Sequence, residues 1–304
     1  MSLTLLELVQ AATTELAIVA VPSAVATSTS LQELQFKGLA NALGRMLTSE
    51  YEWQKIDSEY VLITVATTLS ATTVSGSAVV TMADTTGLSS NYGLTGTGIT
   101  PWAQIVSVDS STQVTMSLPA TVSATSNITF SQNQYDLPSD FESIINDTEW
   151  DRTNRWPLQG PQSAQEWQYI KGGIISNGPR TRFRILDGQI IFNPNPANNL
   201  RFAFEYTSNG WVRSSTGTLK TSFTADNDTC IFDDQLMITG LKLLWLQAKG
   251  LEWGYVQSQF GRRLDIMQAK DKGAPVLSIS RSPSSIYLGP WSIPDGNWGS
   301  NGSS

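Results

Sequence analysis

The stretch from Thr67 to Phe130 contains no lysine, arginine or glutamate, although both flanking parts of the chain carry all three. Such an abrupt change of composition is typical of a boundary between folding units. Short alternating runs rich in Val, Ile and Thr predict strands at 78–82, 104–108, 113–118 and 127–130. Turn-forming clusters such as Leu94–Gly98 separate them. We therefore expect residues 66–130 to form an inserted all-β domain, either a small sandwich or a barrel.

A disordered low-complexity linker is the alternative for this stretch, because Ser, Thr, Val, Ala and Gly dominate it. The regular alternation of Val and Ile argues against that alternative. Asp84 and Asp109 are its only acids. With no basic residue among its members, the stretch does not indicate a metal or catalytic site.

The residues from Phe232 to Lys270 have the pattern of one long C-terminal helix. Apolar residues recur at three- and four-residue steps behind Asp233 and Asp234, which suit a helix start. Glycine weakens a helix interior, so we expect a kink near Gly250.

Two shorter amphipathic helices are predicted near the N-terminus. Thr4 with Glu7, and Ser30 with Glu33, match the capping-box pattern that begins a helix. The apolar faces of these helices would cover the stripe of the long C-terminal helix. The two ends of the sequence are therefore expected to meet in space.

A small sheet is predicted in the second charged part of the chain. Asp187-Gly188 between two apolar runs indicates a hairpin of strands 182–186 and 189–192. Leu200–Tyr206 alternates apolar and polar residues, which predicts a third strand of the same antiparallel sheet.

The predicted fold class is therefore α+β: a helical bundle with one long C-terminal helix and a small antiparallel sheet, plus the inserted all-β domain. Residues 1–65 and 131–274 would form the helical core with its three-stranded sheet. Residues 275–304, which hold several Pro, Gly and Ser residues, would form an extended C-terminal arm.

The chain has no histidine and a single cysteine, Cys230. This excludes histidine triads, cysteine–histidine pairs, thiolate zinc sites and disulfides within the chain. Carboxylate-only catalysis, as in glycosidases, stays open. Cys230 is expected to be a small buried hydrophobic residue. We expect a protein that is not an enzyme and that uses neither a cofactor nor a metal.

Six acids lie close together between positions 136 and 151, and a pair of them could act as acid and base. We favour a structural interpretation, because acids of this kind commonly cap helix starts. The six are Asp136, Asp140, Glu142, Asp147, Glu149 and Asp151.

Two groups of arginines, one beside a tryptophan, could bind nucleic acid or a neighbouring subunit. The net charge of −7 and the position of the second group on the exposed face of a strand favour a subunit interface. The predicted interface residues are Arg152, Arg155, Trp156, Arg182 and Arg184.

Large apolar residues recur in the predicted C-terminal arm, where they have little means of burying themselves. Exposed aromatic residues on such a segment predict docking to a partner. They are Ile286, Tyr287, Leu288, Trp291 and Trp298. No run of eighteen apolar residues occurs, and the basic start and apolar block of a signal peptide are missing, so we expect neither a membrane segment nor secretion.

Four segments taken together resemble phage head-to-tail connector proteins, also called portal adaptors or, in short-tailed phages, tubular tail proteins. The segments are Leu3–Ala12, Tyr135–Phe141, Asn146–Leu158 and Lys249–Trp253. The resemblance covers most of residues 1–63 and 131–273, and no segment is a catalytic signature.

The resemblance implies a structural virion protein that forms a homo-oligomeric ring, commonly of twelve subunits. Such a ring docks under the portal protein, extends the DNA channel and attaches the tail nozzle or tube. The C-terminal arm of such proteins reaches into the portal, which assigns the five arm residues to portal binding. DNA would pass through an acidic lumen without specific binding. The protein would lie at the head–tail junction of the virion, and in the host cytoplasm during assembly.

Two other function classes stay open. A tail-associated carbohydrate-binding or depolymerising protein would use the inserted β domain and the acid cluster. A nucleic-acid-binding packaging factor would use the arginine-bearing strand, and its DNA binding would weaken steeply with salt.

Overall fold

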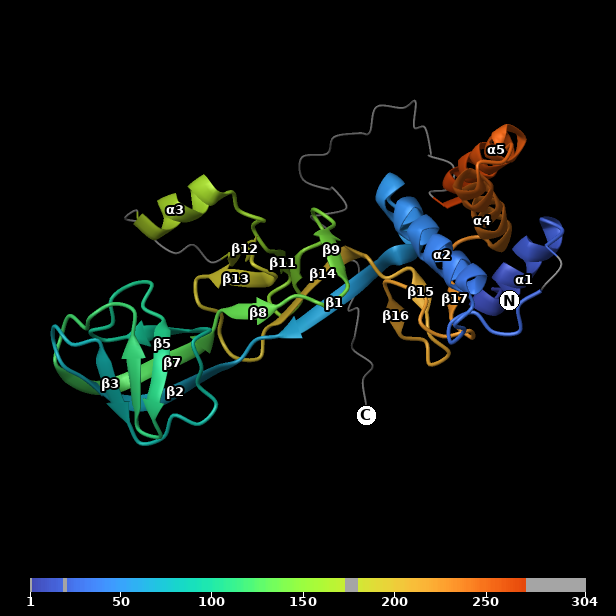
Figure 1. The fold of residues 1–304 in the computed structure, drawn as a ribbon. Coiled ribbons are helices and arrows are strands. Elements are labelled where there is room, and N and C mark those ends of the chain that lie inside the picture. The colour runs from blue at the N-terminus through green and yellow to red at the C-terminus, as the bar shows by residue number, and fades with distance from the viewer. Residues whose placement is uncertain (1, 19–20, 173–179, 272–304) are drawn as a thin grey trace, which may run out of the picture.

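The computed structural model describes residues 2–18, 21–172 and 180–271. The described chain forms an elongated molecule with three parts (Figure 1). A six-stranded sheet lies at one end, a bundle of helices lies at the other, and smaller sheets connect them. The chain begins in the helical bundle, passes through the central sheets into the six-stranded sheet, and returns by the same route.

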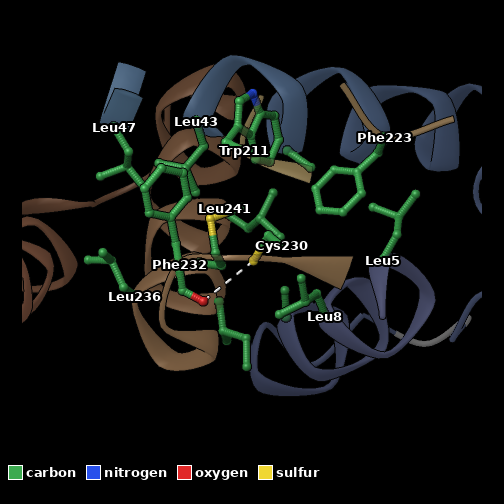
Figure 2. Packing of buried hydrophobic residues seen from close by; sticks show 14 of the residues in the cluster. Leu5, Leu8, Leu43, Leu47, Trp211, Phe223, Cys230, Phe232, Leu236 and Leu241 are labelled. Atoms are coloured by element: carbon green, nitrogen blue, oxygen red, sulfur yellow. Dashed lines mark hydrogen bonds between the residues drawn. The ribbon is translucent and has the colours of Figure 1, made fainter. Parts of the chain in front are cut away.

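Four helices form the bundle, and their buried apolar side chains come from both ends of the described chain. Helices α1 and α2 both pack on α4, as the sequence predicts, and α5 packs on α4 as well. Figure 2 shows this core, in which Leu5, Leu43 and Leu241 are fully buried. The helices are α1 (Leu5–Glu15), α2 (Leu31–Glu50), α4 (Asp234–Lys249) and α5 (Gly254–Asp271).

The predicted capping box of Thr4 and Glu7 is confirmed, because both reciprocal hydrogen bonds form at the start of α1. The predicted box of Ser30 and Glu33 is wrong. Ser30 makes no side-chain capping bond, and the Glu33 carboxylate instead accepts a hydrogen bond from the Ser28 hydroxyl. The helix still begins where the pattern placed it.

The predicted single helix from Phe232 to Lys270 is two helices, α4 and α5. Gly250 ends α4 in the left-handed conformation, with φ 68°, and its N–H donates to the Gln247 carbonyl at 3.1 Å. Helix α5 then runs back along α4. The ion pair between the Arg263 guanidinium of α5 and the Asp233 carboxylate at the start of α4, 2.8 Å apart, shows this direction. The glycine therefore reverses the chain instead of bending one helix.

The N-terminus is joined to the start of α4 and to the segment before it, so the predicted meeting of the N-terminal and C-terminal helices is confirmed, while residues 272–304 lie outside the described residues. The Leu3 N–H donates to the Asp234 carboxylate at 3.0 Å, and Thr4 forms a β-bridge with Thr229. The Leu5 N–H donates to the Asp228 carbonyl at 2.8 Å.

Two glycines let large side chains approach the bundle helices closely. A Cβ atom on Gly44 of α2 would lie 2.2 Å from the ring of Trp211, which is almost fully buried. A Cβ on Gly240 of α4 would lie 2.6 Å from Leu43. These glycines are needed for close packing, although glycine weakens a helix interior.

The centre of the molecule is built from short antiparallel sheets. The predicted hairpin is confirmed as β12 and β13, joined at Asp187 and Gly188, which both have positive φ. The prediction that residues 200–206 extend this hairpin is wrong, because β14 pairs with β1 in another sheet, and β8 is the third strand beside β13.

The central elements are η1 (Gln54–Ile56), α3 (Ala164–Gly172), β1 (Asp57–Ile63), β8 (Gln134–Asp136), β9 (Phe141–Ile144), β10 (Trp150–Asp151), β11 (Trp156–Pro157), β12 (Arg182–Leu186), β13 (Gln189–Asn193), β14 (Arg201–Ser208), β15 (Val212–Arg213), β16 (Leu219–Lys220) and β17 (Thr229–Cys230).

The six-stranded sheet, here called the β unit, occupies residues 66–132 and has the strand order β4-β7-β2-β3-β6-β5. In chain order, β2 is the first strand of the unit and β7 is the last, and these two strands pair with each other. The chain therefore enters at Ala66 and leaves beside it at Ser131, its register partner. The two edge strands also approach each other, since Gly93 and Gln104 form a bridge, and the sheet therefore curls on itself. The strands are β2 (Ala66–Thr73), β3 (Val79–Met82), β4 (Tyr92–Gly96), β5 (Ile105–Ser110), β6 (Gln113–Met116) and β7 (Ala124–Gln132).

Sequence reasoning missed strands β2 and β4. Strand β2 consists mostly of Ala and Thr, and Leu69 is its single large apolar residue, so the alternation that signals a strand is missing. The cluster Leu94–Gly98 was predicted to be a turn because of its glycines, but its first residues belong to β4.

Candidate assembly surfaces

The connection between α4 and α5 exposes three large side chains in a short space of chain. Leu251 is 49% exposed, Trp253 is 38% exposed and Tyr255 is 71% exposed. Gly250 ends α4 and makes these residues the tip of a helical hairpin. Exposed aromatic and aliphatic side chains this close together are typical of a surface that contacts another protein. We call these three residues the hairpin patch.

A second surface is a cleft of about 370 Å³ beside helix α2. Arg45 of α2 and Glu142 of β9 line it, together with Asn209 and Trp211. The Trp211 Nε1 donor and the Asn209 Oδ1 acceptor are buried, and neither has a hydrogen-bond partner among the described residues. A buried polar atom without a partner costs about 1–3 kcal/mol. The cleft therefore combines two opposite charges with hydroxyl and amide side chains, and two polar atoms buried in its lining residues have no partner among the described residues.

The predicted interface residues fall into two places. Arg152, Arg155 and Trp156 lie together on and beside the short hairpin of β10 and β11. The Arg152 guanidinium forms an ion pair with the Glu59 carboxylate of β1, and both side chains are more than 40% exposed. The Trp156 Nε1 is buried and has no partner among the described residues.

Arg182 and Arg184 lie on β12, in a different sheet from the first group. A single β-bridge between Arg182 and Gln159 connects this strand with the chain that follows β11. The Arg182 Nε donates to the Gln159 side-chain oxygen at 3.3 Å. The two arginines are partly exposed on the strand, as the alternation predicted.

The acids between positions 136 and 151 lie on strands and in turns, so the prediction that they cap helix starts is wrong. Asp140 accepts hydrogen bonds from the hydroxyls of Tyr206 at 3.0 Å and Ser208 at 2.7 Å. Burial, reinforced by Asp140, raises the pKa of Tyr206 to about 12. Asp151 accepts from the backbone of Thr153 and from Asn154, and so stabilises the turn between β10 and β11.

Glu149 is the one buried glutamate among the described residues, at 4% exposed. Its Oε1 is buried without a partner among those residues, and burial raises the pKa of its carboxyl above the ordinary value. Of the six acids, Glu149 has the environment that most resembles a catalytic acid. A glycosidase also needs a second carboxylate held at a defined distance, and the carboxylates of Asp140 and Asp151 are already engaged in structural hydrogen bonds.

Cys230 is buried in the bundle core, as predicted (Figure 2). Its thiol contacts the Phe232 carbonyl at 3.6 Å, and burial raises its pKa to about 12. The thiol therefore stays protonated and unreactive at neutral pH.

No group of three His, Cys, Asp or Glu side chains comes together as a possible metal site within the described ranges. No helix in the same part of the chain combines the length and the apolar character that crossing a bilayer requires. The predicted portal-binding residues Ile286, Tyr287, Leu288, Trp291 and Trp298 lie outside the described residues.

Sequence reasoning did not identify the hairpin patch or the cleft beside α2. A signal for the patch was present, because Gly250 marked a possible interruption and large apolar residues follow it. The cleft had no comparable signal, since its lining residues come from distant parts of the chain.

Comparison with protein families matches residues 112–278 of the chain to the model described as SU10 adaptor protein. The matched segment begins just before β6 of the β unit, runs through the central sheets and includes both α4 and α5. No curated protein matches the chain. The family model covers more than half of the 304 residues, so this chain belongs to the SU10 adaptor protein family and is a phage structural adaptor.

Proposed function

We propose that this adaptor assembles into a ring that docks under the portal, extends the DNA channel and carries the tail. The observation that carries the proposal is the hairpin patch, because Leu251, Trp253 and Tyr255 expose three large side chains within five residues at the turn between α4 and α5. Apolar groups of this size are stabilised when a second protein covers them.

A ring needs two different surfaces on each subunit, since a head-to-tail contact joins unlike patches. The hairpin patch is convex and apolar. The cleft beside α2 is concave, and its lining residues include Trp211 and Asn209, each of which has one buried polar atom without a partner among the described residues. A neighbouring chain that supplies a carbonyl and an N–H group would satisfy both atoms.

The net charge of −7 supports a passive channel for DNA. Repeated around a ring, an excess of acidic residues repels the phosphate backbone and lets DNA pass without being held. The arginine groups at Arg152 and Arg182 would then serve contacts between subunits. The role is structural and non-enzymatic in this proposal, with the virion head–tail junction as the site of action.

Ring formation is tested by electron microscopy and mass photometry of the purified full chain, alone and mixed with the portal protein of the same phage. The test variant is Tyr255→Ser, and the matched control is Tyr169→Ser, because both tyrosines are 71% exposed but lie on different helices, α5 and α3. We expect the wild type and the control to form rings, and the test variant to lose most of them. A wild type that stays monomeric in the presence of the portal would overturn the proposal.

Portal docking by the C-terminal arm is tested separately by deleting residues 275–304. We expect the shortened chain to keep its helical content and to lose capture by the portal. Undiminished capture would remove the arm from the proposal and leave the ring contacts to be judged by the first experiment.

A further inference from the structure

A larger cleft lies where the β unit meets α3 and β13, far from the hairpin patch. Its volume is about 590 Å³, within the range of about 300–1,000 Å³ that is typical of small-molecule sites. Residues 94–96 and 99–104 of the β unit form one wall. Ile170 and residues 193–195 form the other.

Asn133 lies at the junction of the two walls with its side chain buried, at 3% exposed. Its backbone is fixed on both sides, because its N–H donates to the Asn91 carbonyl and its carbonyl accepts from the Phe192 N–H. Its side-chain Nδ2 donates to Asn195 Oδ1 at 2.9 Å. The Oδ1 of Asn133 is buried and has no partner among the described residues. This acceptor would be satisfied by a donor group on a bound molecule.

Gly93 provides the space for these amides. A Cβ atom at this position would lie 2.5 Å from both side-chain amide atoms of Asn195 and 2.8 Å from Nδ2 of Asn133. A larger residue at position 93 would therefore displace the amide pair.

Trp102 supplies an apolar side to the cleft. Its backbone has a φ of 69°, and its ring packs edge-to-face on the buried ring of Trp167, with centroids 6.1 Å apart. The Lys171 ammonium lies over the Trp102 ring at 5.7 Å. The indole is thus held by two neighbours while it stays partly exposed at the cleft.

The chemistry of the cleft is neutral and rich in hydrogen-bonding groups. None of the described residues that line it is charged, and four of them carry primary amides: Gln104, Asn133, Asn193 and Asn195. A primary amide both donates and accepts, which matches a hydroxyl group. An aromatic wall beside such groups suits a molecule with apolar C–H faces and many hydroxyls. The lining residues themselves carry no charge that would pair with an ionic ligand, and the Lys171 ammonium beside them is placed over the Trp102 ring.

We propose that this cleft binds an uncharged sugar unit, with the unpaired Oδ1 of Asn133 accepting a hydroxyl hydrogen bond and Trp102 contacting the sugar ring. This site is separate from the hairpin patch and from the cleft beside α2, because it lies at the β-unit end of the molecule (Figure 1). A sugar-binding cleft would give the adaptor a weak contact with glycans in addition to its structural role.

The test uses saturation-transfer NMR of the full chain with three neutral probes, methyl glucoside, methyl galactoside and N-acetylglucosamine. Glucuronic acid and triglycine serve as the charged and peptide probes. We expect at least one neutral sugar to bind with a Kd of about 1 mM or tighter, and the charged and peptide probes to bind more weakly. Absence of transfer to every neutral sugar at millimolar concentrations would overturn the proposal, and so would stronger binding of glucuronic acid or triglycine.

Variants locate the site. Trp102→Ala and Asn133→Leu are expected to weaken sugar binding at least tenfold, whereas Leu31→Ala, which removes an exposed apolar side chain of the bundle outside the hairpin patch, leaves it unchanged. Thr95 is an exposed residue of the lining, so Thr95→Trp should fill the cleft without replacing a buried side chain. Sugar binding that survives both Thr95→Trp and Trp102→Ala would place the sugar elsewhere and overturn the assignment.

Discussion

The β unit and the helical bundle differ in how far apart in the sequence their core residues lie. All buried residues of the β-unit core lie between Ala71 and Phe130, a continuous stretch of chain. The bundle core joins residues near the N-terminus, such as Leu5, with residues near position 260, such as Phe260. The β unit can therefore complete its core by itself, whereas the bundle depends on closing most of the chain into a loop.

The two regions also differ in how their surfaces are held. Pairs of threonine hydroxyls link β2 and β7 of the β unit, at Thr68 with Thr129 and Thr72 with Thr125. The bundle instead uses charged groups between distant elements, such as Lys242 with Glu15 and Arg263 with Asp233. The bundle is therefore the region more sensitive to pH and salt.

The largest expected effect tests whether the two regions unfold separately. Phe130→Ala removes a fully buried ring from the β unit and should destabilise it by about 3–5 kcal/mol. We expect the β unit to melt early while the helical signal in circular dichroism keeps its original transition. The reciprocal variant, Phe36→Ala, removes a fully buried ring from the bundle and should lower only the helical transition. Equal shifts of both transitions by either variant would show that the regions unfold together.

The next effect concerns how closely distant segments approach within the bundle. Gly44→Ala would place a Cβ atom 2.2 Å from the buried Trp211 ring, so we expect a loss of about 3 kcal/mol from overpacking. Gly38→Ala in the same helix meets no atom within 4 Å and should stabilise α2 by up to about 1 kcal/mol. Chemical denaturation measures both. Equal stability of the two variants would mean that the contact between Trp211 and α2 is loose.

The smallest expected effect is a pH-dependent change in the stability of the bundle, which depends on the buried carboxylate of Asp228. The Asp228 carboxylate is buried and accepts hydrogen bonds from the Lys220 ammonium at 2.9 Å, from the Thr224 N–H at 2.8 Å and from the Ala225 N–H at 2.9 Å. Burial acts to raise the pKa of Asp228, but these hydrogen bonds outweigh it and lower the pKa below the ordinary value of 3.8. Its contribution to stability is therefore complete above about pH 4 and is lost as the pH falls through the lower, folded-state pKa.

We expect Asp228→Asn to destabilise the bundle by about 2 kcal/mol near neutral pH, because charged hydrogen bonds to a buried group are lost. Thermal melts should show this difference shrinking as the pH falls below about 4, since the wild-type carboxyl then becomes neutral as well. A difference that stays constant down to acid pH would contradict the assignment to charge. Asp84→Asn in the exposed part of the β unit is the control, and it should change the β-unit transition little.

Much of the fold could be predicted from the sequence where a local pattern decides the structure. The Thr4–Glu7 box and the Asp187-Gly188 turn involve neighbouring residues only, and both are confirmed. The pairing of β14 with β1 was not predictable, because alternation shows which face of a strand is buried but not which distant strand lies beside it. Strand β2 was missed because hydrogen bonds with β3 and β7 stabilise a sequence of low apolar content.

The candidate surfaces were predicted less well than the fold, for the same reason. The arginine groups were visible as composition, but the sequence could not show that Arg152, directly after β10, pairs with Glu59 of β1 across the intervening strand β14. The cleft proposed to bind a sugar combines residues from the β unit, α3 and the end of β13, so it exists only once the chain is folded.

The hydrogen bonds that join the N-terminus to residues 228–234 can form only late in the synthesis of the chain. Helices α1 and α2 leave the ribosome first, yet α4, their packing partner, begins only at Asp234. At about 5–20 residues per second, the nascent helices wait about 10–40 s with their apolar faces uncovered, while the β unit has already been translated completely. Newly made adaptor chains should therefore be clients of cellular chaperones until the last helices arrive.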